Sequence, residues 1–191
     1  RYTFESIASI TEGLNNPRYF MSSCSKGYVS NWVDPFDDTD DFVAVIDLFT
    51  NMVTSIIPVA FGPEKLIMAN NDLYVAHQGG YGQNNILSVI DISANILEST
   101  IEVGDVPNSM VVLNNDIWVL SGGSYTDGDG ASLCQIKNNT LENCMTLGGF
   151  PSDLIIDANG ANLYFVENGE IKTVNVNSPT ISGVVLVPNI T

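Results

Sequence analysis

The feature that most constrains the fold is an internal repeat, present four times in the 191 residues. A proline recurs at spacings of 46, 44 and 44 residues, at Pro17, Pro63, Pro107 and Pro151. An aromatic residue recurs at spacings of 46, 44 and 46 residues, at Tyr28, Tyr74, Trp118 and Tyr164. Further along each copy, FVAVIDLFTNMVTSIIPV, LSVIDISANILESTIEV and SLCQIKNNTLENCMTLG match, and EIKTVNVNSPTISGVVLV is a looser fourth. Self-similarity at this period indicates a series of equivalent structural units.

Each copy predicts four short strands. In the second copy, EKLIMA is followed by NND and LYVA, which is the pattern of a tight hairpin. A variable loop, LSVIDI, a turn and ILESTIEV complete the copy, and LSVIDIS alternates with a period of two. Four strands in about 44 residues are the unit of a β-propeller blade. We therefore predict an all-β chain, a single propeller domain over 1–191, with antiparallel four-stranded blades at about 17–61, 62–105, 106–149 and 150–188.

The ends of the chain suggest a larger ring. Residues 1–16 contain FESIASITEGLNN, which we interpret as the outer strand of a preceding blade. Four blades and one extra strand do not easily close the ring by which propellers remove their sheet edges. We expect this chain to be part of a larger propeller, of about seven blades.

Several phrases carry a resemblance to a known family. VIDLFTNMVTSIIPV, VIDISANILESTIEVGDVPNSMVV and NDLYVAHQGGYG resemble the YVTN-repeat, YncE-like propellers of surface-layer and secreted proteins. The order GYVSNW, VAVIDL, GPEKLIMANNDLYVA, SVIDI, VGDVPNSMVVLNNDIWVLSGG, ASLCQI, PSDLIIDANGANLYFVENGEIKTV looks closer to DUF5074-type surface lipoproteins of Bacteroidetes. This resemblance covers about Gly27 to Val176, and its motifs are mostly structural residues.

The resemblance implies a function as well as a fold. Members of that group include cobalamin-capturing lipoproteins, which sit over a TonB-dependent outer-membrane transporter and pass the vitamin to it. It therefore implies an exported protein of the cell surface, outer membrane or periplasm that binds a small-molecule ligand and is not an enzyme. The ligand does not follow from it, because one fold hosts many sites. The lipid-bearing N-terminal cysteine of such proteins is not in this sequence.

Charge excludes some partners. The chain has 6 Lys+Arg against 22 Asp+Glu, a formal net charge of −16 at pH 7. Such a surface repels nucleic-acid phosphates and anionic lipids, so we expect neither nucleic acid nor a membrane surface as a direct partner. No apolar run approaches the roughly 18 residues that span a bilayer, so we expect no direct membrane insertion.

The loop between the second and third strands of each copy is the expected binding region. In a propeller this loop opens on the same face as the link to the next blade, and here it is elaborated as VDPFDDTDD, QGGYGQNN and GGSYTDGDGA. Aromatic side chains there offer flat contact area, and amides offer hydrogen bonds, which suits planar ligands and protein partners alike. The predicted ligand-binding residues are Trp32, Asp34, Asp37, His77, Tyr81, Gln83, Asn84 and Tyr125. The alternative is that they are ordinary loop residues. The residue after each repeated proline is also expected near this face: Arg18, Glu64, Asn108 and Ser152.

The acidic loops raise the question of a metal. Ca²⁺ takes six to eight oxygen ligands, which closely spaced carboxylates can supply. The candidate ligands are Asp38 and Asp40 in the first loop and Asp127 and Asp129 in the third. Neither loop matches the EF-hand pattern, and aspartate is also a good turn residue, so a solvated loop is the alternative.

His77 and the cysteines leave further alternatives open. His77 is the only histidine, so it is either a ligand for a metal or charged group or a structural residue inside the fold. Cys134 and Cys144 flank the turn at Asn139 symmetrically, which places them within bridging range in a hairpin. They form either a disulfide, in agreement with export, or a pair of buried thiols, and Cys24 is then unpaired.

Three functions fit the sequence, in decreasing order of support. The first is capture of a corrinoid or another small nutrient for an outer-membrane transporter. The second is a structural or adhesive cell-surface module that binds protein or glycan through Trp32, Tyr81 and Tyr125. The third is a lactonase-like or quinoprotein-like enzyme, which needs metal-binding side chains around the channel, with Asn31 and Glu167 as the only candidates in register.

Overall fold

The computed structural model describes residues 5–6, 8–178 and 181–182. These residues form four separate four-stranded sheets, each with its strands in sequence order and each antiparallel. No helix occurs among them. The predicted all-β fold of four-stranded antiparallel blades is therefore confirmed.

The strands follow one another without crossovers. Blade 1 consists of β1 (Pro17–Ser23), β2 (Lys26–Asn31), β3 (Phe42–Asp47) and β4 (Met52–Pro58). Blade 2 consists of β5 (Pro63–Ala69), β6 (Asp72–His77), β7 (Ile86–Asp91) and β8 (Ile96–Glu102). Blade 3 consists of β9 (Pro107–Leu113), β10 (Asp116–Ser121), β11 (Ser132–Lys137) and β12 (Thr140–Thr146). Blade 4 consists of β13 (Ser152–Ile156), β14 (Asn162–Glu167), β15 (Glu170–Asn175) and β16 (Ile181–Ser182). The predicted fourth blade extends to residue 188, and residues 179–180 and 183–188 lie outside the described part.

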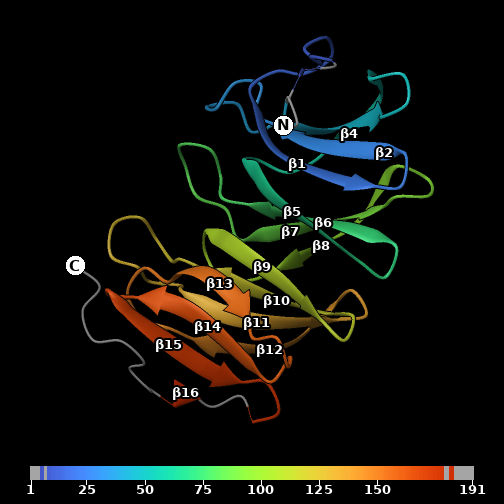
Figure 1. Cartoon of the computed structure of the whole chain (residues 1–191). Coiled ribbons are helices and arrows are strands. Elements are labelled where there is room, and N and C mark those ends of the chain that lie inside the picture. Colours follow the sequence, from blue (N-terminus) through green and yellow to red (C-terminus); the bar gives the residue numbers. More distant parts are fainter. Residues whose placement is uncertain (1–4, 7, 179–180, 183–191) are drawn as a thin grey trace.

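The blades are arranged as an arc, from blade 1 in blue to blade 4 in orange and red (Figure 1). The first strands of consecutive blades, β1, β5, β9 and β13, contact one another extensively, whereas the fourth strands meet only marginally. The first strands therefore lie toward the axis of the arc. The connections between blades and the long loops point to the left in Figure 1, and the short turns point to the right. We call these two sides the loop face and the turn face.

The burial of the strands explains their sequences. The middle strands of blades 1 to 3 are buried on both sides, as in β6 and β7, whose apolar residues follow one another almost without interruption. The fourth strands β4 and β8 alternate or are mostly exposed, with one buried isoleucine near the end of each, Ile57 and Ile101. A sheet that packs between two others needs apolar residues on both faces, whereas an outer strand does not.

Asparagines make the turn face compact. The hairpin between β5 and β6 turns at Asn70 and Asn71, with φ of 52° and 71°. The hairpin between β9 and β10 turns at Asn114 and Asn115, with φ of 51° and 69°. Two consecutive residues with positive φ are characteristic of the type I′ turn, which asparagine tolerates better than most residues. The repeated NND is thus a turn-forming element.

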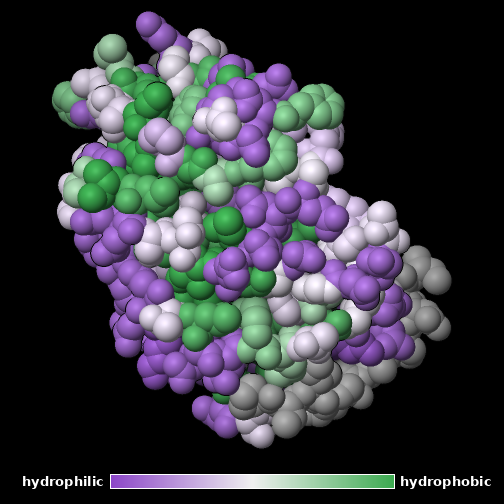
Figure 2. Space-filling model, turned by 180° about the vertical axis from the view of Figure 1, so that it is seen from behind, coloured by the Kyte–Doolittle hydropathy of each residue, from purple (hydrophilic) through white to green (hydrophobic). Residues whose placement is uncertain are grey.

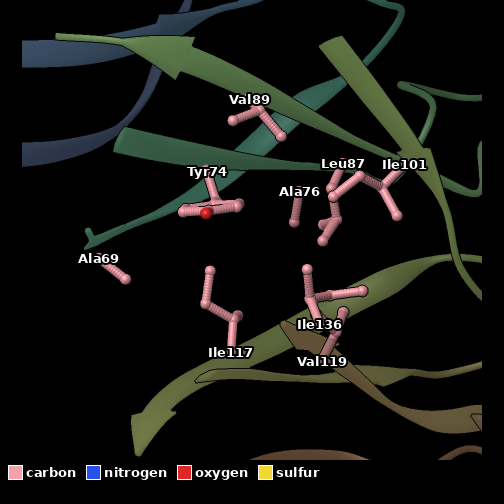
Figure 3. Close-up of a cluster of buried hydrophobic side chains, with 9 residues drawn as sticks. All are labelled: Ala69, Tyr74, Ala76, Leu87, Val89, Ile101, Ile117, Val119 and Ile136. Atoms are coloured by element: carbon pink, nitrogen blue, oxygen red, sulfur yellow. The ribbon is translucent and has the colours of Figure 1, made fainter. Parts of the chain in front are cut away.

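The repeated aromatic residue joins consecutive blades. Figure 3 shows the apolar cluster between blades 2 and 3, in which the ring of Tyr74 faces Ile117. The Tyr74 hydroxyl donates to the Asn139 side chain in a turn of blade 3. In the same way, the Tyr28 hydroxyl of blade 1 lies 3.5 Å from the Ile92 carbonyl oxygen in a turn of blade 2. Burial raises the pKa of Tyr74 to about 12, with contributions from Asp72 and Glu98.

Two cysteines join the outer hairpin of blade 3. Cys134 of β11 lies directly opposite Cys144 of β12, and a disulfide joins them. Of the two alternatives open from the sequence, the structure contains the disulfide. Cys24 is exposed and free.

The far side of blade 1 is only partly covered. Val29, Ala44 and Ile46 are buried there beneath Ile10 and Leu14 of the N-terminal segment. Phe20 and Ile56 remain more than half exposed, and hydrophobic residues are exposed among hydrophilic ones on the upper part of the molecule in Figure 2, where blade 1 lies. Residues 5–6 and 8–16 form no strand. Because the partners of an outer strand would belong to another blade, the interpretation of 1–16 stays a prediction.

Candidate functional site

Hydrogen bonds between loops and connections hold the loop face together. The amide of Gln78 donates to the Gly62 carbonyl oxygen at 2.9 Å, which joins the loop of blade 2 to the connection that enters this blade. The amide of Gly123 donates to Asp105 at 2.9 Å, and the amide of Leu147 donates to Ala131 at 2.9 Å. The elaborated loops and the connections therefore lie on one face, as expected for a propeller.

In three of the four blades, the last residue of the second strand anchors the connection that enters its own blade. Asn31 accepts a hydrogen bond from the Asn15 amide at 3.0 Å, and Glu167 accepts one from the Gly148 amide at 3.3 Å. His77 occupies the same position in blade 2, where its Nδ1 lies 3.3 Å from the Phe61 carbonyl oxygen. Ser121 occupies it in blade 3, and its buried hydroxyl has no partner among the described residues. This position is thus structural in three of the four blades.

His77 is enclosed by the protein. Its ring is 0% exposed, and Nε2 lies 2.9 Å from the Ser88 hydroxyl. Burial lowers the pKa of His77 to about 4, against hydrogen bonds to the carbonyl groups of Phe61 and Ala60. Both ring nitrogens have partners, so the structure favours the structural alternative over the predicted ligand-binding role.

An ion pair bridges the first strands of blades 1 and 2. Arg18 Nε of β1 lies 2.8 Å from Glu64 Oε1 of β5, and the Glu64 side chain is 4% exposed. Burial raises the pKa of the Glu64 carboxyl, and the hydrogen bond from Arg18 opposes that effect. Both residues follow a repeated proline, and the equivalent Asn108 donates to the Pro151 carbonyl oxygen at 2.8 Å, again between blades.

The ring of Trp32 packs against Arg18 of this ion pair. The Arg18 guanidinium lies 4.1 Å from the centre of the Trp32 ring, which is the geometry of a cation–π contact. The indole N–H donates to the Pro63 carbonyl oxygen at 2.9 Å, and the residue is only 8% exposed. Trp32 was predicted to contact a ligand directly. The structure instead places it beneath the surface, where it orients Arg18 and its aromatic neighbour.

Two exposed rings extend this cluster to the surface. Tyr81 meets Trp32 edge to face, with ring centres 6.4 Å apart, and meets Phe36 at 5.1 Å. Phe36 and Tyr81 come from the loops of blades 1 and 2, and they are 80% and 72% exposed. We call Phe36 and Tyr81 the aromatic platform. Phe36 was not among the predicted residues, although its position inside the acidic loop was a signal for it.

Polar groups of the blade 2 loop and of the connection to blade 3 form a hollow on the loop face. Gln83, Asn84, Asn85 and Asp105 line an open hollow of about 270 Å³. The Asn84 amide donates to the Phe61 carbonyl oxygen at 2.9 Å, so this side chain is fixed in place, whereas Gln83 is exposed. Tyr125 in the loop of blade 3 is 54% exposed. Burial of its hydroxyl and the charge of Glu64 raise the pKa of Tyr125.

The aspartates of the first loop act as hydrogen-bond acceptors for turns. Asp34 accepts from the Phe36 amide at 3.0 Å, and Asp40 accepts from the Asp34 amide at 3.1 Å. Asp37 accepts from the amide and the hydroxyl of Thr39, and these hydrogen bonds lower its pKa. Asp41 is buried and accepts from the Gly62 amide at 2.6 Å, and burial raises its pKa. The charge near this strand therefore serves to fold the loop.

The donor sets do not fit the calcium sites considered from the sequence. Asp127 accepts from the Asp129 amide at 3.1 Å, which closes a turn in the third loop. Within the described ranges, no three His, Cys, Asp or Glu side chains come together so that they could hold a metal ion. Asp38, Asp40, Asp127 and Asp129 thus lack the converging carboxylates that a hard cation needs.

Comparisons with known proteins identify the fold and not a family. No family model matches the chain, and no curated protein matches it in sequence. Among solved structures, hydrazine synthase of Kuenenia stuttgartiensis superposes with a TM-score of 0.69 at 18% identity over 92% of this chain. Dihydro-heme d1 dehydrogenase NirN superposes with a TM-score of 0.67 at 13% identity over 87% of this chain. The β-propeller domain of Cps50 (Swd1) from Myceliophteria thermophila superposes with a TM-score of 0.65 at 10% identity over 92%.

The chain spans about half the length of these structures. It covers 50% of the hydrazine synthase chain, 37% of the NirN chain and 56% of the Cps50 chain. At these identities the likeness establishes the β-propeller fold alone. The part of the chain that the structure describes contains no helix with the length and hydrophobicity to cross a bilayer.

Proposed function

We propose that this chain is a binding protein, not an enzyme, and that it holds its ligand on the loop face between blades 1 and 2. The observation that carries the proposal is the continuous contact from Glu64 through Arg18 and Trp32 to the exposed pair Tyr81 and Phe36. Fixed neighbours hold these rings in place before a ligand arrives, which lowers the entropy cost of binding. Asn31 and Glu167, the two candidates for metal ligands of an enzyme around the channel, are already bonded to connections.

A corrinoid is the first candidate ligand. It is supported by the resemblance to cobalamin-capturing surface propellers and by a platform that suits a large planar molecule. With it goes the proposal that the protein is exported to the cell surface, outer membrane or periplasm and passes its ligand to a TonB-dependent transporter. The disulfide supports export, because disulfides persist in oxidising compartments.

Calorimetric titration with cyanocobalamin and dicyanocobinamide tests this candidate. We expect saturable binding of both, and the double variant Phe36→Ala/Tyr81→Ala should weaken it by at least about tenfold. Phe49→Ala is the matched control, because Phe49 is 91% exposed on the turn face. Absence of heat with folded protein would overturn the corrinoid proposal. Equal loss in the control would overturn the assignment to the loop face.

An adhesive module that binds protein or glycan is the second candidate. The observation that favours it is that Phe36, Tyr81 and Tyr125 are each more than half exposed, on a surface with an open hollow rather than a deep cavity. Aromatic residues that project from a surface are characteristic of contacts with macromolecules. If the chain binds a glycan or a protein in samples that contain no corrinoid, that result would support this candidate over the first.

We also propose that the four blades belong to a larger ring. The open arc in Figure 1 and the apolar residues Phe20 and Ile56 on the far side of blade 1 support the presence of a further blade there. A ring of about seven blades is a common closed form of this fold. A full-length gene product of this size that is monomeric and stable would contradict the proposal.

A further inference from the structure

Four of the seven exposed aromatic side chains among the described residues lie on the loop face. Phe36, Tyr81, Tyr125 and Phe150 are 80%, 72%, 54% and 52% exposed. They come from the loops of blades 1, 2 and 3 and from the connection to blade 4, so they are spread over the whole face. Large exposed rings cost free energy in water, and the presence of four of them on one face indicates a surface that is covered in a complex.

The surroundings of these rings carry charge of one sign. The loops and connections of this face are residues 32–41, 59–62, 78–85, 103–106, 122–131, 147–151 and 168–169. They contain no lysine or arginine and eight aspartates, namely Asp34, Asp37, Asp38, Asp40, Asp41, Asp105, Asp127 and Asp129. Arg18, a cation of the first strand β1, is already paired with Glu64. A partner therefore meets aromatic faces inside a negative field.

We propose that the loop face docks a partner protein through a segment rich in lysine or arginine. This proposal rests on the loop face being the binding face, as proposed above, and it names the chemistry of the partner. Cations are attracted to the faces of aromatic rings, and the surrounding carboxylates add long-range attraction. An acidic partner would be repelled, and a purely apolar one would leave aspartates desolvated without a counter-charge. A basic segment can contact the aromatic rings and can also neutralise the surrounding aspartates.

Fluorescence anisotropy with the full chain and a labelled peptide of alternating lysine and alanine tests the proposal. We expect saturable binding, and no binding of the same peptide with glutamate in place of lysine. Raising the salt from about 0.05 to about 0.5 M should weaken binding strongly, because the Debye length falls severalfold. Equal binding of the lysine and glutamate peptides, or no binding of the lysine peptide at low salt, would overturn the proposal.

Two pairs of variants show whether the lysine peptide binds to the loop face or to the acidic surface at large. Phe36→Ala/Tyr81→Ala should weaken binding of the lysine peptide by about tenfold, whereas Phe49→Ala on the turn face should leave its binding unchanged. Asp37→Asn/Asp38→Asn should weaken it about threefold, and Glu142→Gln on the outer strand β12 should not. Equal effects of the test and control variants would mean that the peptide binds to the acidic surface at large, which overturns the proposal. Thermal melting confirms that each variant is folded.

Titration with both probes separates the proposal of a basic partner from the proposal of a corrinoid ligand. If dicyanocobinamide binds in a manner that depends on Phe36 and Tyr81 while the lysine peptide does not bind, the loop face is a ligand site and the basic partner is overturned. If the lysine peptide binds in that manner and corrinoids do not, the basic partner is supported and the corrinoid proposal fails.

Discussion

The turn face and the loop face of this propeller are built by opposite rules. On the turn face, the same residue types recur in successive blades, and they make equivalent contacts: Tyr28 reaches a turn of blade 2 and Tyr74 a turn of blade 3. On the loop face, the loops of the first three blades have unrelated sequences, and the cluster of Arg18, Trp32 and Tyr81 has no counterpart in the described parts of the other blades. Repeated residues hold the blades together, and the unrepeated ones shape the surface on which we propose that a ligand binds.

The largest expected effect separates two tyrosines, one from each face. Tyr74→Ala should lower the free energy of unfolding by about 3 to 5 kcal/mol, because it empties a buried site between blades 2 and 3. Tyr81→Ala should change it by less than about 0.5 kcal/mol, because Tyr81 is largely exposed. Urea denaturation of both variants measures the difference. A comparable loss of stability in the two variants would break the division between the faces.

The second prediction concerns acid and the buried histidine. The pKa of His77 is about 4 in the folded chain and lies near its ordinary value of 6.5 in the unfolded chain. Between these pH values the unfolded state binds a proton at His77 that the folded state does not bind. The contribution of the neutral histidine to stability is therefore fully present above pH 6.5 and is lost as the pH falls toward 4. The loss is on the order of 3 kcal/mol.

Comparison of the chain with His77→Gln isolates this contribution. Urea denaturation at several pH values between 7 and 4 should show a smaller loss for the variant. The carboxyls of Glu64 and Asp41, whose pKa values are raised by burial, act in the opposite sense in both proteins. An unchanged pH dependence in His77→Gln would mean that the histidine is not held neutral inside blade 2.

The third prediction compares two aspartates of the first loop. Asp41→Ala should cost about 1 to 3 kcal/mol, because the buried Gly62 amide loses its acceptor. Asp38→Ala should cost less than about 0.5 kcal/mol, since that side chain is exposed. Thermal melting of both variants under the same conditions gives the comparison. Equal losses would show that the acidic loop is held by something other than these hydrogen bonds.

The smallest expected effect concerns calcium. Because the acidic side chains close turns and do not converge in threes within the described residues, millimolar Ca²⁺ should leave the melting temperature unchanged. A site that binds only the folded chain would raise it. A clear rise in the melting temperature that EDTA reverses would show that the folded chain binds calcium.

The sequence was sufficient for the fold because the fold is repeated. Four copies of the same pattern of proline and aromatic residue, two of them with an NND turn, predicted four-stranded blades, and the structure contains them. Cys134 and Cys144 were within bridging range by symmetry about their turn, although only the structure decided between thiols and a disulfide.

The site was less predictable because it depends on contacts between blades. The loops were placed on one face correctly, and the exposure of Tyr81 and Tyr125 agrees with a surface role. His77 and Trp32, however, are buried, because their side chains turn toward connections that arrive from another part of the chain. No periodicity in a single loop reveals that Phe36 meets Tyr81 from the next blade.

Mapping of amide chemical shifts on the full chain tests directly whether the loop face is the binding face. The chain would be titrated in turn with dicyanocobinamide and with the lysine peptide. We expect at least one of them to shift amides of residues 32–41, 78–85 and 122–131, while the turns at 70–71 and 114–115 stay unchanged. Saturable shifts confined to the turn face or to the outer strands would contradict the assignment of binding to the loop face.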